Sequence, residues 1–87
     1  MVHVEFTPAA VDDLGRLNKP TAQQIFSKIR WLVDHFEVLT PEPLTGQWRS
    51  VYKLRVGDYR VLYTFSRADN SITILFVRHR REVYKTK

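Results

Sequence analysis

The chain has 87 residues, of which 44% are hydrophobic and 26% are charged, and it carries a formal net charge of +5. This length and composition predict one folded domain over residues 1–87 and argue against a disordered chain. The absence of cysteine excludes disulfides and thiolate chemistry and fits a cytoplasmic protein.

The first part of the chain predicts one strand and two helices. Apolar and polar residues alternate over residues 2–6, which indicates a short strand. A Thr-Pro pair at residues 7–8 is a typical helix start, and apolar residues follow at helical spacing as far as Leu17. Residues 18–20 interrupt this helix, and Thr21 is expected to cap a second one. The second helix carries an apolar stripe of Ile25, Ile29, Leu32, Val33 and Phe36.

The second part of the chain changes to a period of two, which is typical of strands. The predicted segments are an extended loop from residue 40, strands at 51–56, 59–65 and 72–78, and turns at 57–58 and 68–71. In the last strand, strict alternation would place Arg78 on the same face as Ile72. Short turns predict an antiparallel meander. The order β-α-α-β-β-β therefore predicts an α+β domain, with a helical hairpin packed on a small, curved, mainly antiparallel sheet.

Positive charge is concentrated in the second half of the chain. Residues 1–45 carry four Lys/Arg and six Asp/Glu, a net charge of −2, whereas residues 46–87 carry ten and three, a net charge of +7. Several of these cations stand inside apolar, β-prone segments, at alternate positions that share one face of a sheet: Lys53, Arg55, Arg60 and Arg78. Such a surface attracts phosphate. Two alternatives would also explain these cations. They are a strand face that is exposed only to solvent and a surface that contacts only an acidic protein.

Two segments carry a resemblance to a known family. They are Tyr-Lys-Leu-Arg-Val-Gly-Asp-Tyr-Arg-Val-Leu-Tyr at residues 52–63 and His-Arg-Arg-Glu-Val-Tyr at residues 79–84. With the order of predicted elements, they resemble the RelE/ParE superfamily of bacterial and archaeal toxins from toxin–antitoxin pairs. The resemblance leaves two branches open: RelE-like members cut mRNA in the ribosomal A site, and ParE-like members inhibit DNA gyrase without being nucleases.

The resemblance to the RelE branch implies a set of catalytic residues at Lys53, Arg60, Arg78 and Tyr84. A second lysine of that branch falls on Arg55, which keeps the charge but cannot act as an acid or base. This match favours a ribosome-dependent endoribonuclease. A ParE-like gyrase inhibitor and a non-catalytic module that binds RNA or the ribosome are the alternatives.

RNA can be cut without a cofactor because its 2′-OH is an internal nucleophile beside the scissile phosphate. Arg60 and Arg78 suit the stabilisation of charge on the phosphate. Lys53 is the better general base, since lysine can lose its proton and neighbouring arginines disfavour its charged form. Tyr84 would stack on a base or orient the 2′-OH.

His79 is a competing acid or base, because histidine titrates near neutrality, but alternation from Arg78 puts it on the opposite face of its strand. Arg80 and Arg81 are expected to be general RNA-phosphate contacts. The three histidines are scattered and no paired carboxylates stand at ligand spacing, so no metal site is expected.

Several of these residues also have purely structural interpretations. Arg60 would form a buried salt bridge with Asp58 or Glu82, Arg78 would be a surface cation at a strand end, and Tyr84 would pack against the sheet.

The resemblance also implies partners. These are a cognate, RelB-like and acidic antitoxin that covers the basic half and the helical-hairpin groove, and a ribosome with bound mRNA. The toxin–antitoxin complex would bind operator DNA through the antitoxin. No membrane is expected, since no apolar stretch approaches the roughly 20 residues of a membrane span, and residues 1–6 do not look like a signal peptide.

Overall fold

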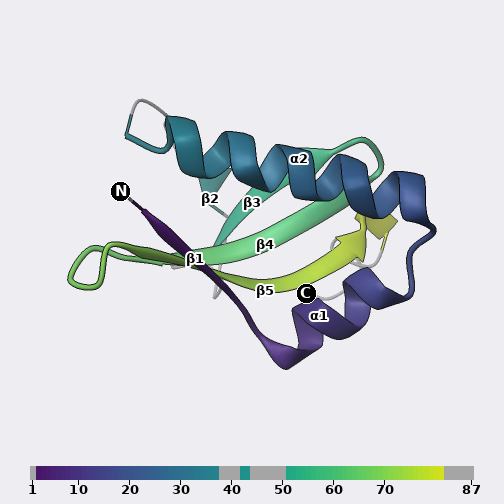
Figure 1. Ribbon diagram of the computed structural model, residues 1–87, viewed down its shortest axis with the longest axis horizontal. Coiled ribbons are helices and arrows are strands. Elements are labelled where there is room, and N and C mark those ends of the chain that lie inside the picture. The colour runs from purple at the N-terminus through teal and green to yellow at the C-terminus, as the bar shows by residue number, and fades with distance from the viewer. Residues whose placement is uncertain (1, 38–41, 44–50, 82–87) are drawn as a thin grey trace.

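The computed structural model describes residues 2–37, 42–43 and 51–81. Its elements are β1 (His3–Phe6), α1 (Pro8–Gly15), α2 (Lys19–His35), β2 (Glu42–Pro43), β3 (Tyr52–Val56), β4 (Tyr59–Ser66) and β5 (Ser71–His79). In Figure 1, α2 lies across the sheet and α1 lies beside the end of β5. The predicted α+β class and element order are confirmed, with the short β2 added within the expected loop. No helix in these ranges is long and apolar enough to span a membrane.

Both helices begin at a side-chain cap followed by proline. The Thr7 hydroxyl accepts a hydrogen bond from the Ala10 N–H at 3.0 Å and donates one to the Leu75 carbonyl at 2.7 Å, so it ties α1 to β5. At α2 the cap is Asn18, whose Oδ1 accepts from the Thr21 N–H at 3.0 Å. The helix therefore begins before Thr21, and the expected cap at Thr21 is wrong. The proline at residue 20 does not delay the start of the helix, because proline is tolerated in the first turn.

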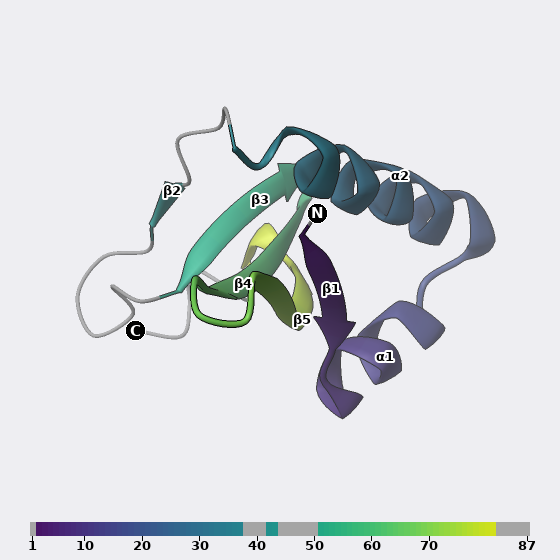
Figure 2. The same ribbon diagram turned by 60° about the vertical axis from the view of Figure 1, so that its left-hand side comes forward.

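The described part of the chain forms a five-stranded sheet in the order β1-β5-β4-β3-β2. β1 runs parallel to β5, and the remaining neighbours are antiparallel. The chain between β1 and β5 runs through both helices and through β2, β3 and β4, which gives the long crossover that a parallel pair of strands requires. Figure 2 shows the sheet curving from β1 to β3 beneath α2. The mainly antiparallel, curved sheet agrees with the prediction.

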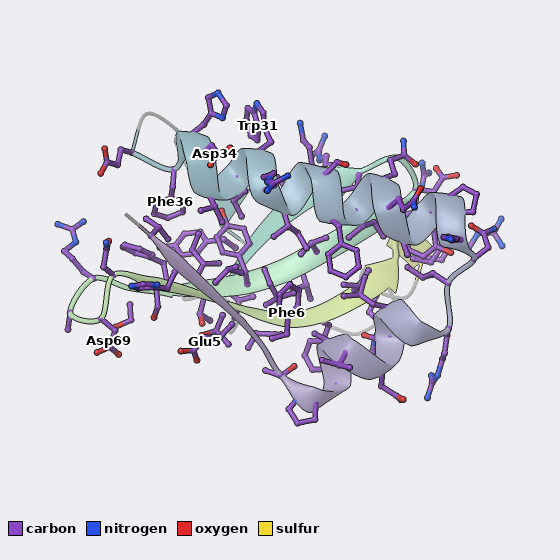
Figure 3. The ribbon with its side chains drawn as sticks, viewed as in Figure 1. Glu5, Phe6, Trp31, Asp34, Phe36 and Asp69 are labelled. Carbon is purple, nitrogen blue, oxygen red and sulfur yellow. The ribbon has the colours of Figure 1, made fainter. Side chains whose placement is uncertain are left out.

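One face of the sheet packs on the helices and forms the core. Ile25, Ile29 and Leu32 of the predicted apolar stripe are buried there, and Val33 and Phe36 pack against the core while half-buried. Figure 3 shows Phe36 turned toward the sheet while Trp31 points away from it. The ring of Phe36 contacts Tyr63 and Phe65, with centroids 6.5 Å and 4.5 Å apart. The buried residues of this cluster are Val2, Ala10, Leu14, Ile25, Ile29, Leu32, Leu54, Val56, Val61, Tyr63, Ile72, Ile74 and Val77.

The pairing between β4 and β5 contains a bulge. Leu62 pairs with Phe76, and the next residue, Tyr63, pairs with Ile74, so Leu75 is an extra residue on β5. An inserted residue interrupts the ladder and reverses the alternation of side chains beyond it.

The bulge decides which face Arg78 occupies. Val77 is 3% exposed and joins Ile72 and Ile74 in the core. Arg78 therefore lies on the other face, opposite Arg60. The expectation that Arg78 shares the face of Ile72 is wrong, because strict alternation takes no account of the inserted residue.

Candidate functional site

The sheet register brings three arginines into one row across three strands. Arg55 of β3 pairs with Arg60 of β4, and Arg60 pairs with Arg78 of β5. Residues directly opposite one another on neighbouring strands present their side chains to the same face. This face is the reverse of the one that carries Val61 and Tyr63 into the core. We call these three residues the arginine row.

Lys53 lies on the same face as the arginine row. It stands two residues before Arg55 on β3 and pairs with Leu62 of β4. Its side chain is half-buried, whereas Arg55 is exposed. The described strands thus bring together four of the cations that the sequence singled out, from three different strands.

Arg60 is buried at the centre of the arginine row, with 8% of its surface exposed. Its Nη1 donates to the carbonyl oxygens of Gly57 at 3.1 Å and Tyr59 at 3.0 Å, which ties the side chain to the turn between β3 and β4. Gly57 has a φ of +59°, the left-handed conformation that glycine adopts without strain. Within the described ranges, the Arg60 Nε has no acceptor. Burial of a charged donor without a partner is costly, and the two hydrogen bonds of Nη1 offset part of that cost.

The predicted salt bridge of Arg60 with Asp58 is not formed. The Asp58 carboxylate is 71% exposed and lies 4.0 Å from Arg80 Nη1 instead. Glu82, the other predicted partner, lies outside the described residues.

Arg78 is held by α1. Its Nε donates to Asp13 Oδ2 at 2.9 Å, and the same oxygen accepts the Val77 N–H at 3.0 Å. The guanidinium carbon also lies 4.6 Å from the centre of the Phe76 ring. The Arg78 side chain is 38% exposed, and Asp13 fixes its position near the end of β5.

Sequence reasoning did not find Asp13. The available signal was its place on the apolar side of a short helix, since it stands three residues after Ala10 and next to Leu14, which are both buried. A carboxylate at such a position needs a partner, because burial without one is unfavourable.

The remaining predicted residues lie near the end of β5. His79 pairs with Tyr59, and their rings meet edge-on with centroids 5.5 Å apart, on the face opposite Arg78 as expected. The Arg81 N–H donates to His79 Nδ1 at 3.3 Å, and the Arg80 N–H donates to the Asp58 carbonyl at 2.7 Å. Both of these arginines are exposed.

Tyr84 lies outside the described residues, so its role remains a prediction. Across residues 2–37, 42–43 and 51–81, no group of three or more His, Cys, Asp or Glu side chains is arranged to hold a metal ion.

A family model of the ParE toxin of type II toxin–antitoxin systems matches residues 4–84. The chain belongs to the RelE/ParE toxin superfamily. The predicted family is therefore confirmed, and the toxin matches the model over nearly its full length. A comparison with curated proteins found no match.

Solved structures agree with this assignment. The toxin is similar to a chain of the RelBE2 toxin–antitoxin complex from Mycobacterium tuberculosis, with a TM-score of 0.80, 25% identity, and 90% of this chain and 96% of that chain covered. The archaeal RelE–RelB complex from Pyrococcus horikoshii gives a TM-score of 0.67, 26% identity, and coverage of 91% and 94%. The isolated E. coli RelE toxin gives 0.76, 19% identity, and coverage of 98% and 93%, and it supports the fold alone.

Proposed function

We propose that the toxin is a ribosome-dependent endoribonuclease that cuts mRNA in the ribosomal A site. The observation that supports this most is the arginine row with Lys53 on the same face of the sheet. Cations from three strands of one sheet are held in fixed relation, as stabilisation of a phosphate in a transition state requires. Arg55, Arg80 and Arg81 would add contacts to RNA phosphates.

The proposed reaction is an attack of the RNA 2′-oxygen on the adjacent phosphorus. Lys53 takes the proton of the 2′-OH, and the new P–O bond closes a 2′,3′-cyclic phosphate. The bond from phosphorus to the 5′-oxygen breaks, and the leaving 5′-oxygen takes up a proton from water. Arg60 and Arg78 stabilise the charge on the phosphate oxygens, and Arg55 supplies fixed charge. Tyr84 would stack on a base or orient the 2′-OH. No cofactor forms part of the proposal.

The proposal includes partners. Two of the similar structures are complexes of a RelE-type toxin with its RelB-type antitoxin. We propose that an acidic, RelB-like antitoxin likewise covers the basic half of this toxin and carries the pair to operator DNA. The ribosome with its bound mRNA would be the target, in the cytoplasm.

A gyrase inhibitor is the second candidate, because the family model that matches residues 4–84 is that of the ParE toxin. A non-catalytic module that binds RNA or the ribosome is a further alternative.

Cleavage and gyrase assays separate these functions. The wild type and an Arg67→Ala control, which removes an exposed cation from the turn between β4 and β5, are incubated with an mRNA on programmed ribosomes and with the same mRNA alone. We expect cuts in frame with codons on ribosomes, almost none on free mRNA, and no effect on DNA supercoiling by gyrase. Inhibition of gyrase with intact mRNA would establish the second candidate, and ribosome binding without cuts would establish the non-catalytic module.

A further inference from the structure

We infer that Asp13 is a positioning residue that orients Arg78 toward the phosphate, an inference that rests on the proposed nuclease function. α1 follows β1 along the edge of β5, at the point where the parallel pairing of these strands ends after Phe6 and Ile74. The Thr7 N–H donates to the Ile74 carbonyl at 3.0 Å and begins this change from strand to helix. Further along α1, Asp13 accepts a backbone hydrogen bond from the part of β5 that lies beyond its pairing with β1.

A single oxygen of Asp13 serves two different purposes. By accepting the Val77 N–H at 3.0 Å, it satisfies a backbone donor of a residue that is 3% exposed. By accepting the Arg78 Nε–H at 2.9 Å, it holds the side chain of the last cation in the arginine row. The first contact stabilises the fold, and the second sets the direction of the guanidinium.

The way Asp13 holds Arg78 leaves the guanidinium usable. Within the part of the chain that the structure describes, Arg78 contacts the Asp13 carboxylate through Nε alone. The two Nη groups of Arg78 therefore remain available as a pair of parallel donors. The ring of Phe76 lies 4.6 Å below the guanidinium carbon and supports it from one side. Paired donors from one arginine suit a phosphate, and holding them in advance removes the rotamer entropy that a mobile arginine would lose.

The Asp13 carboxylate could either neutralise Arg78 or position it, and these two roles predict opposite effects on cleavage when the carboxylate charge is removed. A carboxylate that only neutralised Arg78 would weaken phosphate binding, so its removal would strengthen RNA binding and speed cleavage together. A positioning carboxylate acts on the geometry of the reaction, so its removal would slow cleavage while RNA binding stays equal or becomes tighter.

The test compares Asp13→Asn with a matched control, Asp12→Asn, on the same helix. Asp12 pairs with Arg16 at the surface, where its side chain is 66% exposed. The asparagine oxygen can still accept from the Val77 N–H, whereas the neutral amide holds Arg78 less firmly. On programmed ribosomes, Asp13→Asn should slow single-turnover cleavage about ten- to a hundredfold, as small misplacements of a catalytic group do. Asp12→Asn should keep the wild-type rate, and Asp13→Glu should recover part of the loss.

A double variant shows whether Asp13 acts through Arg78. In an Arg78→Ala background, Asp13→Asn should change the cleavage rate less than about twofold, because the group it positions is gone. An undiminished effect in that background would overturn the inference and leave only a role in folding. A wild-type rate in the single Asp13→Asn variant would overturn it as well.

The proposed function fails on different data, namely a wild-type toxin that leaves ribosome-bound mRNA uncut. Relaxation of the Arg78 15Nε signal provides a measurement that does not need cleavage. Asp13→Asn should increase the motion of this group while Asp12→Asn leaves it unchanged, and equal motion in both variants would contradict the positioning role.

Discussion

Arg55 and Arg60 are directly opposed on neighbouring antiparallel strands, so two positive charges occupy one cross-strand pair. Like charges at such positions destabilise a sheet. Arg60 is in addition buried, and its opposite neighbour on β5 is a third arginine, Arg78. The fold therefore gathers positive charge at the place where the proposed function needs an anion.

The first prediction follows from this relationship. Arg55→Gln removes one of the two opposed positive charges and hence a cation that would face a bound anion. Inorganic phosphate should stabilise the wild type more than it stabilises Arg55→Gln. Chemical denaturation with and without phosphate measures this difference, with Arg67→Gln as the control for an exposed cation elsewhere. Equal stabilisation of the wild type and of Arg55→Gln by phosphate would show that Arg55 does not contribute to anion binding.

The second prediction separates the two phosphate-binding arginines. Arg60→Ala and Arg78→Ala should each lower the single-turnover cleavage rate by roughly two to three orders of magnitude, as loss of an electrostatic stabiliser does. Arg60→Ala should also cost about 1–3 kcal/mol of stability, because it removes the bonds from Nη1 to the carbonyls of Gly57 and Tyr59.

Stability and cleavage are therefore measured on the same preparations of these variants. Arg67→Ala should change neither quantity. Wild-type cleavage by folded Arg78→Ala would remove Arg78 from the proposed site. If the activity of Arg60→Ala falls only in proportion to its loss of folded protein, the role of Arg60 is structural.

The third prediction concerns proton transfer by Lys53. Lys53→Arg keeps a positive charge on the same face but removes a usable base, so it should slow cleavage nearly as much as Lys53→Ala. Arg55→Lys should be mild, because it keeps the charge at a position where only charge is needed. The measurement is the single-turnover rate on programmed ribosomes across a pH series. Near-normal cleavage by Lys53→Arg with an unchanged pH profile would make Lys53 an electrostatic contact, and the base would then be sought at His79, Tyr84 or the ribosome.

The fourth prediction concerns stability at alkaline pH. Burial of Tyr63, with a smaller effect of nearby Tyr52, raises the pKa of its phenol from 10.0 to about 12. A group whose pKa is raised in the folded state contributes stability that is complete below its ordinary pKa and is lost as the pH rises through the raised value. The difference corresponds to about 3 kcal/mol, lost between about pH 10 and pH 12.

Tyr63→Phe cannot ionise and should lose less stability over that interval than the wild type. Tyr59→Phe, at a half-buried position in the same strand, is the control that keeps the Tyr63 phenol. Denaturant unfolding at pH 9 and pH 11 measures the difference. The same loss of stability in the wild type and in Tyr63→Phe would mean that other groups cause the alkaline unfolding.

Local patterns in the sequence were sufficient to predict most of the elements. The Thr7-Pro8 start of α1, the apolar stripe of α2 and the alternation in β3 and β4 all reflect interactions between residues a few positions apart, and the structure confirms them. The start of α2 was misplaced because both Asn18 and Thr21 are good capping residues, and only the backbone decides between them.

The candidate site depended more on tertiary structure. The sequence determined which cations stand in strands, and hence that a basic face would exist. The face of Arg78 was decided by the bulge at Leu75, which appears only when β4 pairs with β5. Local polarity would place Arg60 at the surface, but packing buries it. The bond from Arg78 to Asp13 joins two positions that are far apart in the chain. Periodicity reports contacts within an element, whereas register and side-chain partners are set by packing between elements, so the geometry of this site follows from the fold.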